Sequence, residues 1–201
     1  MAKKTKNYRG YSRRKTNTRE LRIRFLIVCE GTKTEPNYFN SFRVPKNVVE
    51  IDVRGVGKDP SQLVDDAKKI RDNDDYDRIW CVFDRDSWTP ENFNNAISSA
   101  KSQGFEVAYS NEAFELWYIL HFEYLNTATS RKDYGDKLSN HLEKPYKKND
   151  PTIYDELLPR QETAIKNAKK LLNQYDRHDP ANNNPATTVH LLVESLNECS
   201  T

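Results

Sequence analysis

The chain lacks any long hydrophobic run, because no apolar stretch approaches the roughly 20 residues that span a bilayer. Its basic start also lacks the apolar core of a secretory signal. We therefore expect no association with a membrane. The sequence has only three cysteines, Cys29, Cys81 and Cys199, and they lack the spacing of a zinc site. An odd number of cysteines without that spacing favours a reducing, cytoplasmic location.

A Walker nucleotide-binding loop is also absent, as are internal repeats. The segment Gly55-Val-Gly57-Lys58 lacks the Gly-Lys-Ser/Thr ending and the full spacing of such a loop, so it predicts a tight turn. Any ATP-driven step would then belong to a separate ATPase chain. The 201 residues, of which 36% are hydrophobic and 31% charged, are enough for one substantial core.

The formal net charge of +2 hides a division between the start of the chain and the rest. Residues 1–24 carry ten Lys or Arg and one acid, a charge of +9, whereas the remaining 177 residues carry 22 bases and 29 acids, a charge of −7. We expect residues 1–22 to form a basic, flexible arm, which suits attraction to the phosphate backbone of nucleic acid. A solvated tail that contacts nothing is the alternative interpretation.

Short apolar runs alternate with helical patterns over residues 23–123. Each run is too short for a typical helix and is bounded by polar residues, so it predicts a strand. The predicted strands cover residues 23–29, 48–53, 79–83 and 105–109. Helices are predicted to start near Pro36, Pro60 and Pro90, since proline is favoured in a first helical turn. This alternation predicts an α/β fold with a mostly parallel central sheet flanked by helices.

Beyond Asn111 the pattern changes to helices. Residues 113–122 are rich in aromatics and are predicted to pack on the sheet. Further helices are predicted at 132–142, at 161–175 and after Pro185 with Thr187 or Thr188 as cap, and a loop is predicted at 143–155. The predicted organisation is a basic arm (1–22), an α/β core (23–123) and a helical C-terminal region packed on the core (124–201).

Carboxylates follow two of the predicted strands. Glu30 comes directly after the first strand, and Asp84 and Asp86 come after the strand at 79–83. Groups just past the carboxyl ends of parallel strands converge in one crevice. Carboxylates held together there would repel one another unless a cation lay between them, and hard oxygen ligands select Mg²⁺ or Mn²⁺. The pattern predicts a metal site for phosphate chemistry; acids that merely cap loops are the alternative.

Several motifs in a fixed order resemble one protein family. They are Cys29-Glu-Gly-Thr-Lys-Thr-Glu-Pro-Asn-Tyr-Phe39, Gly55-Val-Gly57, Val82-Phe-Asp-Arg-Asp86, Ser110-Asn-Glu-Ala-Phe-Glu-Leu-Trp117 and Asn184-Pro-Ala-Thr-Thr-Val189. Together they resemble the RloB-like family, related to the abortive-infection protein AbiLii, and the strand ends Glu-Gly and Asp-x-Asp resemble the Toprim domain of primases, topoisomerases and several nucleases. The resemblance implies a Toprim-like fold, a divalent metal and a role in bacterial defence against phage, and Toprim nucleases suggest cleavage of nucleic acid.

By this resemblance Glu30 takes the place of the Toprim glutamate, as a general base or as a ligand that helps to place a second metal ion. Asp84 and Asp86 take the Asp-x-Asp positions, and both can reach one ion because alternate residues of a strand share a face. Such an ion would polarise the scissile phosphate. Glu115 matches an acid of the family motif and is expected to face the crevice as a further ligand or base; a structural ion pair is the alternative.

Other residues near these motifs have weaker signals. We expect Lys33 to neutralise a substrate phosphate oxygen, with a solvated loop lysine as the alternative. Arg85 should point to the opposite side of its strand unless loop geometry returns it toward phosphate. Asn111 is expected to cap the following helix or to contact substrate. Glu35 is interpreted as a helix-start charge rather than a ligand, and His121 as a packed histidine.

The sequence thus favours a Mg²⁺- or Mn²⁺-dependent nuclease that acts on DNA or RNA in anti-phage defence. One alternative is a regulatory subunit that binds metal or nucleotide without cleavage, and another is a passive partner of an ATPase. Whether the chain forms a homo-oligomer is left open. One stretch of aromatic and basic residues could form a surface that stacks bases and binds phosphates. The alternative is that these are ordinary surface residues. The members of this stretch are Tyr134, Lys137, Tyr146, Lys147 and Lys148.

Overall fold

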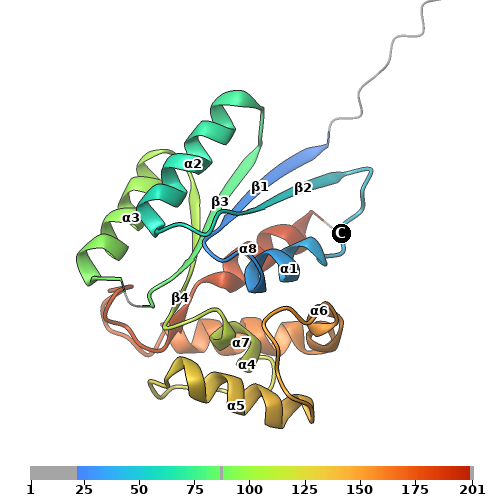
Figure 1. The fold of residues 1–201 in the computed structure, drawn as a ribbon, viewed down its shortest axis with the longest axis vertical. Helices are drawn as coiled ribbons and strands as arrows, with labels where there is room; N and C mark the ends of the chain where they lie inside the picture. Colours follow the sequence, from blue (N-terminus) through green and yellow to red (C-terminus); the bar gives the residue numbers. More distant parts are fainter. Residues whose placement is uncertain (1–21, 87, 200–201) are drawn as a thin grey trace, which may run out of the picture.

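The computed structural model describes residues 22–86 and 88–199. Its centre is a five-stranded sheet with the strand order β2-β1-β3-β4-β5 (Figure 1). The strands are β1 (Ile23–Cys29), β2 (Val49–Gly55), β3 (Arg78–Asp84), β4 (Glu106–Asn111) and β5 (Ala186–Thr187). The first four strands run parallel, and β5 pairs antiparallel with β4. The predicted α/β architecture with a mostly parallel sheet is confirmed.

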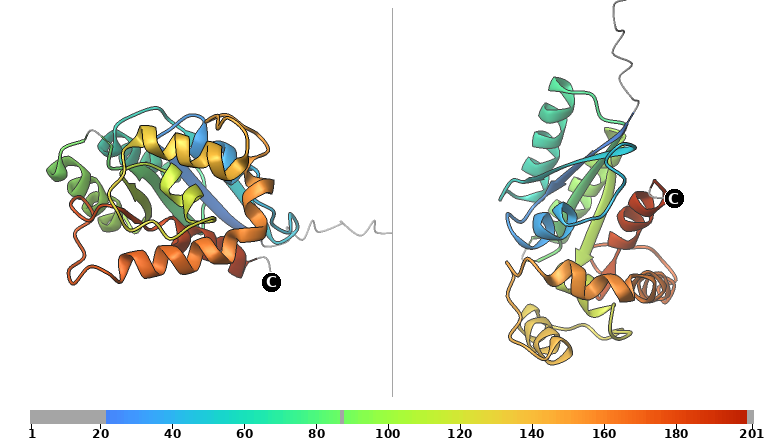
Figure 2. Two further views of the ribbon diagram at one scale, coloured as in Figure 1. Left: turned by 90° about the horizontal axis from the view of Figure 1, so that it is seen from below. Right: turned by 90° about the vertical axis from the view of Figure 1, so that its right-hand side faces the viewer.

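Helices cover both faces of this sheet. They are α1 (Thr34–Asn40), α2 (Pro60–Asn73), α3 (Pro90–Ser102), α4 (Glu115–Ile119), α5 (Arg131–Leu142), α6 (Ile153–Leu157), α7 (Gln161–Leu172) and α8 (Val189–Glu198), with a short 3-10 turn, η1, at Leu158–Arg160. Helices α2 and α3 pack on one face, and α1, α4, α7 and α8 belong to the apolar core on the other (Figure 2). The predicted packing of the aromatic segment 113–122 on the sheet is confirmed.

Strand β1 lies in the centre of the sheet and is apolar along most of its length. Phe25 and Ile27 point into the core with α1 and α4, whereas Leu26 and Val28 point into the core with α2 and α3. All four side chains are fully buried. A parallel strand that is covered on both faces needs a continuous apolar run rather than an alternating one. The run of apolar residues before Glu30 is therefore what places this acid at the end of a central strand.

The helices on the α2 side begin where the sequence predicts. Asp59 precedes Pro60, and its carboxylate accepts hydrogen bonds from the Ser61 and Gln62 amides. Thr89 precedes Pro90 in the same way, and its hydroxyl oxygen accepts from the amide of Asn92. Each cap satisfies amide groups that have no partner inside the helix, and proline loses no hydrogen bond at the first helical position. These local signals fix the crossovers that connect the parallel strands.

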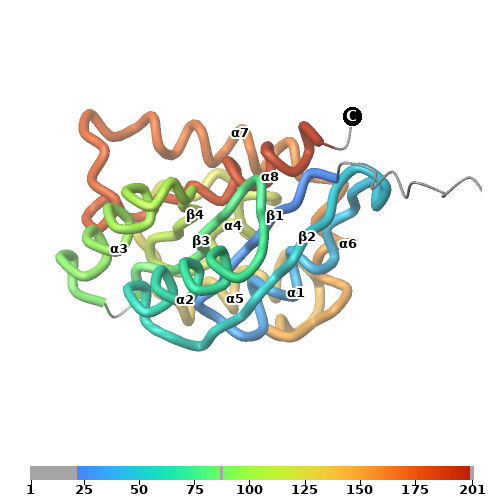
Figure 3. Tube along the Cα trace, turned by 90° about the horizontal axis from the view of Figure 1, so that it is seen from above, coloured from blue at the N-terminus to red at the C-terminus, as the bar shows by residue number. Residues whose placement is uncertain are grey.

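The C-terminal region differs from the predicted all-helical region. It contributes β5 to the sheet, a strand of two residues that is too short to produce an alternating pattern. Thr188 stands at the N-cap of α8, as predicted, but its hydroxyl accepts from the Tyr109 amide and caps no amide of the helix. The Thr187 hydroxyl accepts from the amide of Val189, the first residue of α8, at 3.2 Å. Helix α6 lies partly within the predicted loop at 143–155. Helix α8 ends beside the start of β3, where Arg78 donates to the Ser195 hydroxyl (Figure 3).

The basic arm predicted for residues 1–22 lies outside the described residues, apart from Arg22. Within the described part of the chain, none of the helices has both the length and the apolar character needed to cross a membrane. All three cysteines are free thiols, and Cys29 and Cys81 are buried.

Candidate functional site

A pocket of about 410 Å³ opens at the carboxyl ends of β1 and β3. Charged side chains dominate its lining. The acids are Glu30, Glu35, Asp59, Asp84, Asp86 and Glu115, and the bases are Lys33, Lys58, Arg131 and Lys148. The acids thus outnumber the bases by two, and Lys58 also pairs with Asp66 on α2. This excess of negative charge is concentrated where the parallel strands end, which is the usual position of a site in an open α/β sheet.

Glu30 is held in one orientation by two donors. Its Oε2 accepts from the Asp84 amide at 3.0 Å, and its Oε1 accepts from the indole Nε1 of Trp88 at 2.9 Å. Burial raises the pKa of Glu30, and these two hydrogen bonds oppose that rise. The structure thus brings together Glu30 and Asp84, which are 54 positions apart in the sequence.

Asp84 and Asp86 share one cationic partner. Arg131, the first residue of α5, places Nη2 3.6 Å from Asp84 Oδ2 and Nη1 3.2 Å from Asp86 Oδ2. The same Asp84 oxygen accepts from the Phe114 amide at 3.1 Å. Its other oxygen, Oδ1, is buried and has no hydrogen-bond partner among the described residues. Burial, reinforced by repulsion from neighbouring acids, raises the pKa of Asp84 well above its usual range.

Glu35 lies in the first turn of α1, as the sequence predicts. The sequence did not predict that this side chain is buried and lines the pocket. Burial, with repulsion from Glu115 and Glu30, raises the pKa of Glu35 to about 7. A Cβ on Gly31 would lie only 2.2 Å from the Glu35 carboxylate, so the Glu-Gly motif leaves the space into which this acid packs.

The predicted turn after β2 closes the pocket on one side. The amide of Gly57 donates to the Glu30 carbonyl at 2.9 Å, and Gly57 has a φ of +62°, which favours glycine. A Cβ on Gly55 would lie 2.7 Å from the Gly31 carbonyl oxygen. These glycines therefore allow the end of β2 to pack directly against the loop that carries Glu30.

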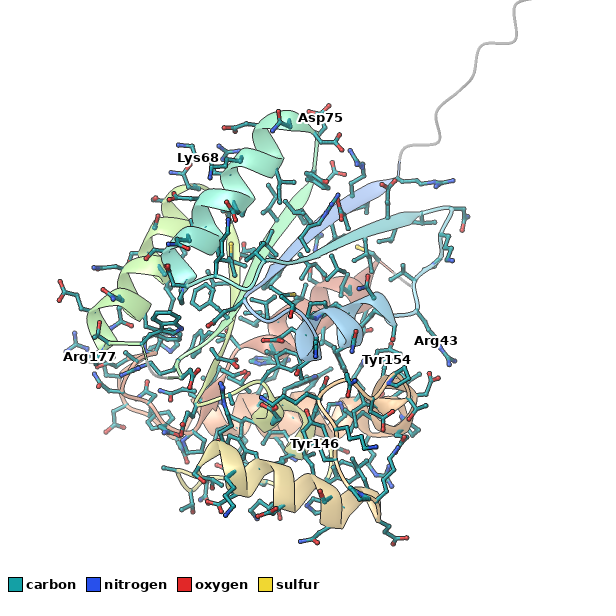
Figure 4. The ribbon with its side chains drawn as sticks, in the orientation of Figure 1. Arg43, Lys68, Asp75, Tyr146, Tyr154 and Arg177 are labelled. Carbon is teal, nitrogen blue, oxygen red and sulfur yellow. The ribbon has the colours of Figure 1, made fainter. Side chains whose placement is uncertain are left out.

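Glu115 faces the pocket and is also paired. Its side chain is 4% exposed; Lys148 Nζ lies 3.4 Å from its Oε1, and the Tyr146 hydroxyl donates to the same oxygen at 3.4 Å. Tyr146 lies between α5 and the helices of the core (Figure 4). The sequence left two alternatives for Glu115, a position that faces the crevice and an ion pair. In the structure Glu115 has both.

The three residues expected to contact substrate separate into two groups. Lys33 lines the pocket, and its side chain is exposed and forms no ion pair with another described residue. Arg85 lies on the opposite side of its strand, where Nε donates to the carbonyl of Ala181. Asn111 does not cap α4; its amide donates to the carbonyls of Pro180 and Ala181. Arg85 and Asn111 therefore hold the loop before β5 and lie outside the pocket lining.

The predicted aromatic and basic surface does not form. Tyr134 is fully buried, Tyr146 is half-buried, and Lys137 pairs with Glu123 at 2.8 Å. Rings in these positions are not free to stack on bases. The interpretation failed because the helical spacing of α5 turns Tyr134 toward α4 and the core.

His121 is a packed histidine, as the sequence predicts. It is buried, with Nδ1 2.9 Å from the Trp117 carbonyl oxygen, and burial lowers its pKa to about 4. It does not line the acidic pocket.

Four members of the site were missed or undervalued from the sequence. Glu35 belongs to the Glu-Gly-Thr-Lys-Thr-Glu motif, which was a usable signal. Trp88 follows the Asp-x-Asp motif by two residues and was not considered. Arg131 and Lys148 come from the C-terminal region, and no local pattern connects either residue with the strand ends.

The donors in the pocket fit a divalent cation by charge and by chemistry. All the acids of the pocket offer hard oxygen atoms, which suit Mg²⁺ or Mn²⁺, and one Asp84 oxygen is buried with no partner among the described residues. As the side chains stand, no group of three or more His, Cys, Asp or Glu residues in the described chain is arranged to hold an ion. The guanidinium of Arg131 lies against both aspartates instead. Asp84 and Asp86 would hold the ion, with Glu30 as the adjacent acid.

The fold and the pocket together define an α/β protein with an acidic site at the carboxyl edge of a parallel sheet. A family model described as RloB-like protein matches residues 25–196. The chain therefore belongs to the RloB-like family. No curated protein and no solved structure shows a significant match to the chain.

Proposed function

We propose that this protein is a Mg²⁺- or Mn²⁺-dependent phosphodiesterase that cleaves nucleic acid as an effector of bacterial defence against phage. The observation that carries the proposal is the meeting of Glu30 with Asp84 and Asp86 in one pocket, where both aspartates contact a single cationic group. An arrangement that accepts one shared positive group suits one shared metal ion. Membership of the RloB-like family is compatible with a role in defence.

Each residue of the pocket has a role under this proposal. Asp84 and Asp86 hold the metal ion, which when bound polarises the scissile phosphate. Glu30 accepts a proton from the attacking water, because its carboxylate is oriented by two donors and its raised pKa makes it a stronger base. Lys33, exposed at the pocket, neutralises a phosphate oxygen of the substrate.

The order of the acids supports a Toprim-like core. One acid follows β1 and an Asp-x-Asp pair ends the neighbouring parallel strand β3. This is the arrangement that the resemblance to Toprim domains implies. By the same resemblance the substrate is DNA or RNA. The three free cysteines favour a cytoplasmic location, and the absence of a Walker loop from the sequence assigns any ATP-driven step to a separate ATPase partner.

Cleavage assays test this proposal directly. The purified protein is incubated with tRNA, single-stranded RNA and plasmid DNA, with Mg²⁺ or Mn²⁺ and with a chelator. We expect metal-dependent cleavage of at least one substrate, and a loss of at least about 100-fold when Asp84→Ala and Asp86→Ala are combined, since a bound metal supplies several kcal/mol. Asp65→Ala, an exposed acid on α2, is the matched control and should cleave normally. Cleavage by the double variant at the wild-type rate would contradict the site.

A second candidate is a subunit that binds metal or nucleotide in the same pocket and regulates an ATPase partner without cleavage. The ion pairs of Arg131 and Lys148 favour it, because they neutralise acids that a nuclease would need for its metal. Calorimetry that detects metal-dependent nucleotide binding, together with no turnover of any nucleic acid, would select this candidate over the nuclease.

A further inference from the structure

The C-terminal region places two cations among the acids of the core. Arg131 contacts Asp84 and Asp86, and Lys148 contacts Glu115. Both bases come from α5 and the segment that follows it, whereas the acids that they contact follow β3 or begin α4. The two cations therefore neutralise acids that a different part of the chain supplies.

Arg131 is fixed in this position by the way α5 begins. Ser130 is the N-cap, and its hydroxyl accepts from the Asp133 amide at 3.3 Å. Tyr134, three positions after Arg131, is fully buried and anchors the first turn of the helix in the core. Nε of Arg131 is buried as well and has no hydrogen-bond partner among the described residues. The packing of α5 thus places the guanidinium between the aspartates, with 36% of the Arg131 side chain exposed.

A metal ion that bound the Oδ2 atoms of Asp84 and Asp86 would compete with this guanidinium, which contacts both of these atoms. Mg²⁺ binds carboxylate oxygens at about 2.1 Å, and Arg131 Nη1 already lies 3.2 Å from Asp86 Oδ2. An ion on that oxygen would lie within about 5 Å of the guanidinium, where two positive charges repel strongly in a partly buried pocket.

We propose that Arg131 is a built-in counter-ion of the Asp84–Asp86 pair that a divalent cation must displace before it binds. The proposal rests on the metal site assigned under the proposed function. It adds that the metal-free pocket is stabilised by the chain itself. The affinity for metal is therefore set by α5 as well as by the acids.

Manganese binding tests the competition without any measurement of activity. Free Mn²⁺ is followed by electron paramagnetic resonance in titrations of the wild type, Arg131→Gln, Lys148→Gln and the combined Asp84→Asn and Asp86→Asn variant. Arg131→Gln should tighten binding roughly three- to tenfold, the size expected for loss of one partly buried competing ion pair. Lys148→Gln removes the same charge from the same pocket but leaves the aspartates paired, and should change the affinity by less than about twofold.

The outcomes separate the two proposals. Absence of Mn²⁺ binding in every variant overturns the metal site itself, as does full binding by the variant without both aspartates. If the wild type binds Mn²⁺ and Arg131→Gln binds it equally or more weakly, the counter-ion proposal alone is overturned. The same holds if Lys148→Gln tightens binding as much as Arg131→Gln does, because the effect would then come from the net charge of the pocket. If Arg131→Gln does not fold, Arg131→Lys keeps the charge but loses the two-pronged contact. An affinity about two- to threefold tighter than that of the wild type then supports the proposal, and an unchanged or weaker affinity overturns it.

Discussion

Acidic residues of this protein lie in two opposite settings, the pocket at the carboxyl edge of the sheet and the outer surface. Glu30, Glu35 and Asp84 are crowded in the pocket, and burial raises the pKa of each. On the surface, the Lys58 ammonium lowers the pKa of Asp66, and hydrogen bonds from Thr152 and Lys144 lower that of Asp150 to about 2. The partners of Asp66 and Asp150 outweigh the cost of their burial, whereas the partners of the pocket acids offset that cost only in part.

The difference indicates which acids carry function. A buried carboxylate without sufficient compensation lowers the stability of the fold, so the sequence gains nothing structural from three of them in one pocket. Titratable groups with raised pKa values in a cleft are candidates for a functional site. The cost is reduced by Arg131 and Lys148 but not removed, since Asp84 Oδ1 still lacks a partner among the described residues.

The largest effect on stability is expected where a pocket acid is packed most tightly. In Gly31→Ala the new Cβ would lie 2.2 Å from the Glu35 carboxylate, so that side chain must move within the pocket. We expect a loss of about 1–3 kcal/mol in the free energy of unfolding, measured in urea. Gly135→Ala, inside α5, is the matched control: a Cβ there would meet no atom of the described residues within 4 Å, so the substitution should stabilise the fold by about 0.5–1 kcal/mol.

A double-variant cycle shows whether the clash is with Glu35. Glu35→Ala in the Gly31→Ala background removes the carboxylate that the new methyl group meets, and most of the lost stability should return. Equal costs of Gly31→Ala in the presence and absence of the Glu35 carboxylate would place the strain elsewhere in the loop.

Neutralising Glu35 should have a smaller effect of the opposite sign. Because its pKa is about 7 in the folded protein and about 4.5 in the unfolded chain, the folded state binds more protons between these values. Stability is therefore lost as the pH rises through this window, and Glu35→Gln should remove that loss. We expect a gain on the order of 1–2 kcal/mol at about pH 8 and little change at about pH 4.5.

Urea unfolding at the two pH values measures this gain, with Glu91→Gln, an exposed acid of α3, as the control that should change little. If Glu35→Gln is less stable than the wild type at the higher pH, the Glu35 carboxylate is compensated in the pocket. The contrast between pocket acids and surface acids is then lost.

The sequence predicts the parts of the site that depend on local signals. Apolar runs locate the strands, and Pro60 and Pro90 locate the starts of α2 and α3. The ends of the parallel strands then bring together Glu30 and Asp84. The burial of Glu35 is not visible locally, because a glutamate in a first helical turn is normally a solvated charge. The contacts of Arg131 depend on how α5 packs, which is a property of the whole fold and not of the residues around it.

The smallest effect is expected at the surface, and its sign should be the reverse of that at Glu35. Asp150 accepts from the Thr152 hydroxyl at 2.7 Å and from Lys144 at 2.9 Å. Because its pKa is lowered to about 2, its stabilising contribution is present above the unfolded pKa of about 3.8 and is lost as the pH falls toward 2. Asp150→Asn should therefore destabilise the protein by about 0.5–1 kcal/mol at about pH 7, the range of partly exposed pairs.

Chemical denaturation at about pH 7 and about pH 3 measures this loss, which should shrink at the lower pH as the wild-type carboxylate protonates. The effect of Glu35→Gln on the free energy of unfolding should have the opposite sign, and it should grow as the pH rises from about 4.5 to about 7. If Glu35→Gln and Asp150→Asn both destabilised the protein at neutral pH, the carboxylate of Glu35 would be as well compensated in the pocket as that of Asp150 is on the surface. The position of the pocket at the strand ends would then be the remaining argument for its function.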